Sequence, residues 1–134
     1  IADELDFVSF HYYRDTKDFL SAYDKMKNAI PCGKITVLQE YGSSSYSGVW
    51  NAFLNSEGKQ AAYYEEIQPL LNEAQIPFLF WTLYDFEGVP SSVVGKRPWR
   101  REPQRYFGCL DLGGKPKKAF YFLNNTSKNR KEND

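Results

Sequence analysis

Three short apolar runs of the sequence end in side chains that can do chemistry on a ligand. The first run ends in His11–Tyr13, the second in Glu40–Gly42 and the third in Trp81–Asp85. An imidazole, a carboxylate and an indole therefore close one run each, with phenols around them. Aromatic faces stack on the C–H surface of a pyranose ring, and a carboxylate can attack or stabilise an oxocarbenium-like centre. This combination suits a sugar.

Each of these residues also has a plainer interpretation. Glu40 is the strongest candidate, because an unpaired carboxylate at the end of an apolar strand is costly. Its alternative is a strand-end carboxylate that faces solvent or pairs with a neighbouring cation. His11 is the only histidine, and an imidazole at the core boundary explains it equally well. Trp81 can be a core residue, although its place at the end of its run favours a ligand platform.

The elements that must position these side chains alternate along the chain. The pattern predicts strands at 5–13, 35–40 and 78–83, and helices at about 16–30 and 56–74. This order is typical of a parallel sheet with right-handed crossovers. The nearly continuous apolar runs indicate strands that are covered on both faces. In such folds function lies at the carboxyl ends of the strands, where the three groups fall.

The second half of the chain is less regular. Pro69 is expected to kink the second helix. Residues 84–107 are expected to form a long irregular stretch, which is uncommon inside a compact domain unless it is functional. A short helix is predicted from about Lys117, and residues 124–134 form a polar tail.

Composition excludes several classes of protein. The 134 residues carry 17 basic and 17 acidic side chains, and this zero net charge argues against a nucleic-acid protein that binds by bulk charge. No apolar run approaches the roughly 18–20 residues of a membrane span. The segment 96–105 holds five basic residues and Trp99, and we interpret it as a solvated loop or a rim that recruits substrate. Cys32 and Cys109 show no metal-site spacing, and a disulfide between them stays open.

Four segments together resemble one known family. Residues 6–13, 35–42 and 78–85 resemble strands six, seven and eight of the retaining glycoside hydrolases with a (β/α)8 barrel, which include the family 2 and family 5 β-glycosidases. Residues 106–121 resemble the Gly-Leu-x-Asp-x-x-Gly-Lys-Pro-Lys pattern that leads into the last helix of these barrels. The resemblance covers about residues 5–123.

The resemblance implies an α/β fold, namely a partial (β/α)8 TIM barrel with about the last three βα units and parallel strands. Residues 1–123 are then the C-terminal portion of a glycosidase catalytic domain. A whole barrel takes about 250 residues, so the N-terminal part is expected to lie outside this chain. The open strand edges are expected to pair with that missing part or with a second copy of the chain.

The resemblance also assigns roles to individual residues. Glu40 matches the nucleophile of a double displacement, in which a second carboxylic acid protonates the leaving oxygen. His11 and Tyr13 match a His-x-Tyr pair whose tyrosine hydrogen-bonds the nucleophile, and Trp81 matches the tryptophan under the reacting sugar. With the residues around them, the expected substrate-binding set is His11, Tyr12, Tyr13, Tyr41, Trp81, Asp85 and Trp99.

One departure from the family is large. The acid/base residue of the family is a Glu after an Asn at the end of strand four, and Asn72-Glu73, the only Asn-Glu here, falls in a predicted helix. The chain alone is therefore expected to be inactive, while its parent hydrolyses β-O-glycosidic bonds without a metal or cofactor. The alternative is a catalytically inactive carbohydrate-binding or scaffold protein that keeps the barrel. The expected partner is a carbohydrate, not a nucleic acid or a membrane. The sequence does not assign a localisation, and a secreted or periplasmic protein is one option.

Overall fold

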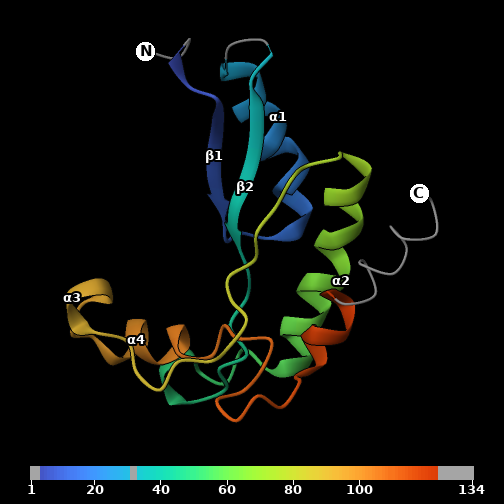
Figure 1. The fold of residues 1–134 in the computed structure, drawn as a ribbon. Coiled ribbons are helices and arrows are strands. Elements are labelled where there is room, and N and C mark those ends of the chain that lie inside the picture. The colour runs from blue at the N-terminus through green and yellow to red at the C-terminus, as the bar shows by residue number, and fades with distance from the viewer. Residues whose placement is uncertain (1–3, 31–32, 124–134) are drawn as a thin grey trace.

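The computed structural model describes residues 4–30 and 33–123. Cys32 and the tail predicted at 124–134 lie outside these residues, so a Cys32–Cys109 disulfide is not tested. Two strands, β1 (Phe7–Tyr12) and β2 (Ile35–Tyr41), pair in parallel. The helix α1 (Phe19–Ala29) connects them (Figure 1). This part of the fold is the predicted strand–helix–strand unit.

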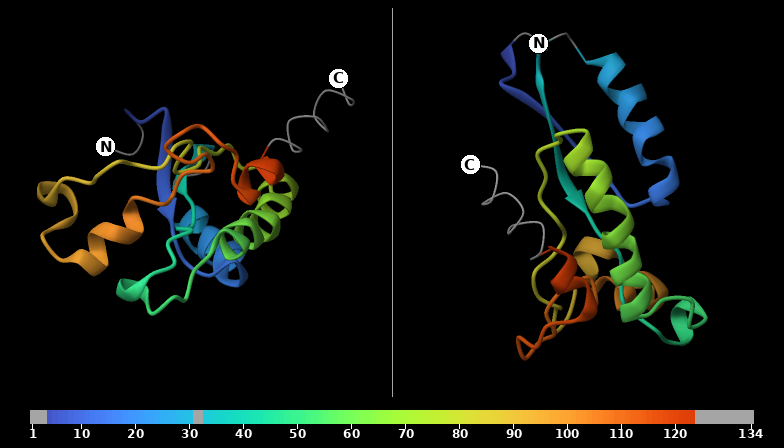
Figure 2. Two further views of the ribbon diagram at one scale, coloured as in Figure 1. Left: turned by 90° about the horizontal axis from the view of Figure 1, so that it is seen from below. Right: turned by 90° about the vertical axis from the view of Figure 1, so that its right-hand side faces the viewer.

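A side-chain cap precedes each long helix, one short turn ahead of α1 and directly before α2. Asp15 accepts a hydrogen bond from the Lys17 amide (3.1 Å) and starts a short 3-10 turn, η2 (Thr16–Asp18), which runs into α1. Ser56 accepts a hydrogen bond from the Lys59 amide (3.2 Å) and starts α2 (Glu57–Glu73). Pro69 lies inside α2. Figures 1 and 2 show α1 and α2 on the same side of the sheet.

The core fills the space between the sheet and these two helices. Its members with less than 2% exposure include Phe19, Leu38, Tyr41, Tyr64, Ile67, Leu71 and Ile76. The Tyr41 ring makes edge-to-face contacts with Tyr64 and Phe78, both at 5.7 Å between centroids. Such pairs add to the hydrophobic stabilisation of a core. Much of the aromatic content therefore serves packing.

The third predicted strand does not form as a regular strand. Residues 78–83 run beside β2, with the amide of Leu79 donating to the carbonyl of Leu38 at 2.9 Å, but only the Leu38–Phe78 bridge is formed. The next hydrogen bond joins Trp81 to Tyr41 (2.8 Å). In a regular parallel ladder the Trp81 amide would donate to the carbonyl two residues after Leu38. It donates to the third residue instead, because β2 contains an extra residue at Gln39.

The region 84–107 is only partly irregular. It contains two short helices, α3 (Ser91–Val94) and α4 (Pro98–Gln104), which the sequence analysis missed. Pro98 occupies the first turn of α4, where its missing N–H costs nothing and its fixed φ suits a helix. Another short turn, η3 (Val49–Asn51), follows β2 and contacts α4. Residues 118–123 are helical, as predicted.

The sheet is covered on one face only, among the residues that the structure describes (Figures 1 and 2). The sequence predicted strands covered on both faces. Instead burial alternates along β1, with Phe7, Ser9 and His11 on the uncovered face. Phe7, Ile35 and Leu79 are 54%, 60% and 63% exposed. The uncovered face is thus apolar at the amino ends of the strands.

Candidate active site

Glu40 lies at the carboxyl end of the sheet beside two residues of the neighbouring strand. The parallel register places His11 of β1 opposite Glu40 of β2. The Tyr13 hydroxyl donates a hydrogen bond to Glu40 Oε2 at 2.8 Å. His11 Nδ1 lies 3.4 Å from the same oxygen. Three of the predicted site residues are therefore brought together around one carboxylate oxygen.

A β-bulge in β2 sets the direction of the Glu40 side chain. In the strand register Gln39 is skipped, because Phe10 pairs with Leu38 and His11 pairs with Glu40. Leu38 and Tyr41 are both fully buried on the helix-covered face. Strict alternation after Leu38 would bury Glu40 and expose Tyr41. The extra residue reverses that outcome, since Glu40 now shares the uncovered face with His11.

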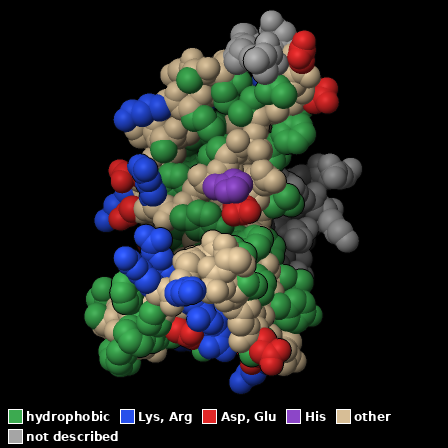
Figure 3. Space-filling model, turned by 90° about the vertical axis from the view of Figure 1, so that its left-hand side faces the viewer, with side chains coloured by type: hydrophobic (Ala, Val, Ile, Leu, Met, Phe, Trp, Pro, Cys, Tyr) green, Lys and Arg blue, Asp and Glu red, His purple; other side chains and the backbone are tan. Residues whose placement is uncertain are grey.

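Tyr13 is suited to keep its proton beside the carboxylate. Burial, then the hydrogen bond to Glu40 and the charge of that carboxylate, raise the pKa of the Tyr13 phenol well above its usual value. Its ring packs edge-on against Phe107, with centroids 5.9 Å apart. A protonated, fixed phenol therefore donates to Glu40 throughout the neutral range. Figure 3 shows the histidine at the surface with an acidic side chain next to it.

Trp81 is tied to β2 through its backbone. Its amide donates to the carbonyl of Tyr41, the residue after Glu40, at 2.8 Å. Gly42 permits this approach, because a Cβ there would collide with the Trp81 carbonyl. The Trp81 ring packs against Phe86 with centroids 5.8 Å apart, and the peptide bond between Trp81 and Thr82 is cis.

The remaining predicted substrate-binding residues contact other parts of the chain. Tyr12 and Tyr41 are 5% and 0% exposed and belong to the core on the helix-covered face, so neither ring offers a face to a ligand. Trp99 is exposed on α4, with the Arg97 guanidinium 5.5 Å from its ring centroid. Asp85 is buried in an ion pair.

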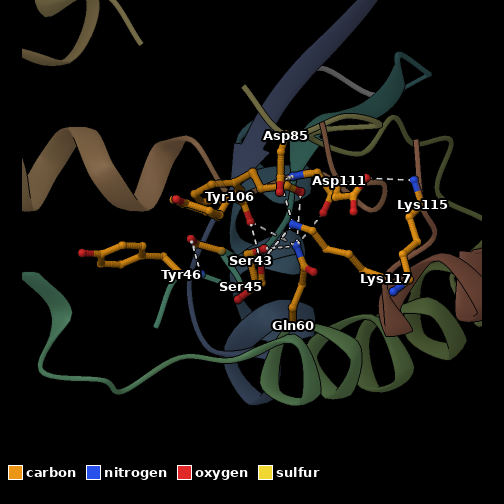
Figure 4. A network of polar contacts seen from close by, with 12 residues as sticks. Ser43, Ser45, Tyr46, Gln60, Asp85, Tyr106, Asp111, Lys115 and Lys117 are labelled. Carbon is orange, nitrogen blue, oxygen red and sulfur yellow. Dashed lines mark hydrogen bonds and ion pairs between the residues drawn. The ribbon is translucent and has the colours of Figure 1, made fainter. Parts of the chain in front are cut away.

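The ion pair of Asp85 lies in a buried polar network that joins distant loops (Figure 4). Asp85 Oδ1 accepts from Lys117 Nζ at 2.6 Å and from the Gly108 amide at 2.9 Å. Lys117 Nζ also lies 3.0 Å from Ser45 Oγ. Both charged side chains are less than a tenth exposed. A buried charge of this kind requires a partner, and Lys117 supplies it.

Gln60 completes the network from α2. Its amide nitrogen donates to the carbonyls of Ser43 at 2.9 Å, Gly108 at 3.2 Å and Phe107 at 3.3 Å. Neither Gln60 nor Lys117 was predicted from the sequence as a site residue. The signal for Gln60 was a glutamine in helical register with the apolar residues Tyr64 and Ile67, and the structure shows it fully buried. Lys117 is 32 residues from Asp85, and no local pattern predicts their pairing.

Cys109 is a free, buried cysteine. Burial raises the pKa of the Cys109 thiol from 9.0 to about 11, so this side chain is protonated and weakly nucleophilic at neutral pH. Within residues 4–30 and 33–123, no cluster of three or more His, Cys, Asp or Glu residues is arranged to hold a metal ion. In the same residues no helix is long and apolar enough to cross a membrane.

The backbone is similar to parts of several solved glycoside hydrolases. A β-1,3-glucanosyltransferase from Rhizomucor miehei, solved as an active-site mutant with laminaritriose, superposes with a TM-score of 0.67 at 19% identity and matches 88% of this chain. A glycoside hydrolase family 2 β-galacturonidase from Eisenbergiella tayi gives 0.70 at 21% identity over 92% of this chain. A β-glucuronidase from Faecalibacterium prausnitzii gives 0.63 at 18% identity over 91%.

These similarities concern the fold. The chain spans 43%, 24% and 21% of the three solved chains, in the same order. Neither a family model nor a curated protein matches the sequence. The resemblance to glycoside hydrolases drawn from the sequence is confirmed at the level of the fold, since the solved structures named above are glycoside hydrolases.

Proposed function

We propose that this chain is the nucleophile-bearing part of a retaining β-glycoside hydrolase. The observation that carries the proposal is the position of Glu40 Oε2, 2.8 Å from Tyr13 Oη and 3.4 Å from His11 Nδ1, at the carboxyl end of parallel strands. Active sites of barrel enzymes lie at this end. The backbone similarity to solved glycosidases supports the same class.

In the proposed reaction Glu40 attacks the anomeric carbon of a β-linked sugar. The glycosidic C–O bond breaks as the new C–O bond to Glu40 forms, and a second carboxylic acid gives its proton to the leaving oxygen. Water then hydrolyses the glycosyl-enzyme, and its proton returns to the second carboxylate. Tyr13 orients Glu40, and His11 and Trp81 bind the sugar.

We propose that the second carboxylic acid comes from outside this chain. Asp85 and Glu87 are the carboxylates that follow the third apolar run, and neither matches the family's acid/base position after strand four. Lys117 and the Gly108 amide, moreover, already hold Asp85. A partner that covers the uncovered sheet face, either the remainder of a barrel or a second copy, would add the missing group opposite Glu40. The two carboxyl groups of a retaining site lie about 5–5.5 Å apart.

The test is covalent labelling of Glu40. A 2,4-dinitrophenyl 2-deoxy-2-fluoro-β-glycoside needs no general acid, because its leaving group departs as a stable anion, so the chain itself can be used. A panel of gluco, galacto and manno reagents covers the unknown sugar. We expect the chain to gain the mass of one fluorosugar, and we expect peptide mapping to place that sugar on Glu40.

Glu40→Gln should abolish this labelling, while Glu65→Gln, at an exposed position of α2, should leave it unchanged. Undiminished labelling of the Glu40→Gln variant, or a label on another residue, would contradict the assignment of Glu40 as the nucleophile.

A carbohydrate-binding protein without catalysis is the second candidate, and the engagement of Asp85 by Lys117 favours it. In that case no reagent of the panel reacts, yet sugars still perturb the Trp81 signal in a titration. The labelling experiment therefore separates the two candidates.

A further inference from the structure

The segment after Trp81 folds back and forms an open pocket of about 200 Å³. Its walls are mostly apolar and include Trp81, Phe86, Val89, Pro90 and Val93, with Gln104 as a polar residue of the lining. The pocket lies among residues 81–104, which follow the carboxyl end of the sheet (Figure 1). Ligand sites of open α/β sheets occur at this end.

The pocket is large enough for one aromatic ring. An apolar cavity of about 150 Å³ in another protein binds benzene. A second sugar unit is a poor occupant, because its hydroxyl groups would lose their hydrogen bonds to water against walls that return few of them. The Trp81 and Phe86 rings, 5.8 Å apart, offer the edges and faces on which an aromatic ring packs.

The pocket shares Trp81 with the proposed sugar site, so whatever fills it lies next to the sugar. We infer that it binds an aromatic ring linked to that sugar, so that the substrate is an aryl glycoside or a glycan with an aromatic substituent. This inference rests on the proposed function. Because the pocket is independent of the Glu40 chemistry, its occupancy can be measured without any reaction.

The probe is phenol, titrated into the nitrogen-15-labelled chain. The chain has three tryptophans, so three indole N–H signals are expected. Trp81→Phe identifies the signal of Trp81 by its loss. We expect phenol to shift the Trp81 signal with saturation and to leave the signals of Trp50 and Trp99 in place. Among phenyl β-D-glucoside, β-D-galactoside and β-D-mannoside, at least one should bind more tightly than phenol and than its own methyl glycoside, because it fills both sites.

Val93→Asp should weaken phenol binding at least about tenfold, because the carboxylate of the new side chain would be desolvated by the ring. Val93 is 74% exposed, so this change should leave the fold intact. Val93→Thr, which keeps the shape of the wall, should lose less. Val49→Asp, at an exposed position of η3 outside the pocket lining, is the matched control and should bind phenol normally.

An unshifted Trp81 signal, or equal phenol affinity in the Val93→Asp variant, would overturn the inference. The inference would also be overturned if none of the three phenyl glycosides bound more tightly than phenol, since the ring and the sugar would then occupy unlinked sites. The covalent-labelling experiment tests the proposed function separately. If that function is wrong, Glu40 is not labelled although phenol still saturates the pocket.

Discussion

At the scale of residues, the candidate site is a carboxylate with two neighbours on one oxygen. Glu40 Oε2 receives the Tyr13 hydroxyl and lies near His11 Nδ1. Hydrogen bonds to an ionised group are stronger than those between neutral groups, so Tyr13 fixes the orientation of the Glu40 carboxylate. The raised pKa of Tyr13 keeps this donor in place. We therefore regard Tyr13 as a positioning residue.

Tyr13→Phe should slow the labelling of Glu40 by the fluorosugar reagent about tenfold to a hundredfold. The reason is that a nucleophile free to rotate spends less time in line with the anomeric carbon, and a small misplacement has an effect of this size. The measurement is the rate of mass gain at several reagent concentrations. The maximal rate should fall, while the concentration at half-maximal rate should stay constant.

Tyr121→Phe, at an exposed position of the final helix, is the control and should label at the normal rate. Equal rates for the Tyr13→Phe variant and the unmodified chain would show that Glu40 is oriented by other contacts.

At the scale of elements, the loops that follow the strands are joined by buried polar contacts. Asp85 follows the third apolar run, Lys117 directly precedes the C-terminal helix, and Gln60 reaches from α2 to the carbonyls of residues 43, 107 and 108. Gly108 must lack a side chain, because a Cβ there would collide with the Asp85 amide. These buried contacts therefore hold in place the backbone that follows Trp81.

Asp85→Asn should lower the free energy of unfolding by about 3–5 kcal/mol, because it leaves the Lys117 ammonium buried without a charged partner. Chemical denaturation followed by tyrosine and tryptophan fluorescence measures this change. The double variant Asp85→Asn with Lys117→Met should be less destabilised than the sum of the two single variants, since the pair is then removed together.

The Glu102–Arg105 pair provides a control. Its atoms lie 2.9 Å apart, but its side chains are 26% and 30% exposed. Glu102→Gln should therefore change the free energy of unfolding by less than about 1 kcal/mol. An Asp85→Asn variant as stable as Glu102→Gln would mean that the buried pair does not hold the loops.

At the scale of the whole molecule, one sheet face is covered by α1 and α2 and the other is not, among the residues described. Phe7, Ile35 and Leu79 expose more than half of their surface on or beside this uncovered face. Apolar patches of this kind mark interaction sites. In the described part of the chain β1 has a strand neighbour on one edge only, so its other edge can pair with a further strand. Both features point to a partner on this face.

The chain should self-associate when no other partner is present. Sedimentation velocity should show a weight-average mass that rises with concentration. The double variant Phe7→Lys with Ile35→Lys should sediment as a monomer, because each lysine places a charge that resists burial in the interface. Leu112→Lys, at an exposed position in a turn, should associate like the unmodified chain. A folded monomer at every concentration would contradict this prediction.

The sequence predicted the local structure well where the cues were local. The helical apolar spacing predicted α1 and α2, and two apolar runs predicted β1 and β2. The third run, at 78–83, was predicted as a strand and forms only a bridge. Its hydrogen bonding depends on the bulged strand β2, and no pattern within residues 78–83 indicates that bulge. The α4 helix was missed, although Pro98 was in a position that suits a helix start.

The sequence by itself determined which side chains stand near the strand ends, because strand limits follow from local apolar patterns. The tertiary structure decided which way they face. The bulge at Gln39 turns Glu40 to the uncovered face and Tyr41 into the core, and the register with β1 brings His11 opposite Glu40. It also decided that Asp85 pairs with Lys117. Strand register and long-range ion pairs depend on chain segments far apart in the sequence, so only folding brings them together.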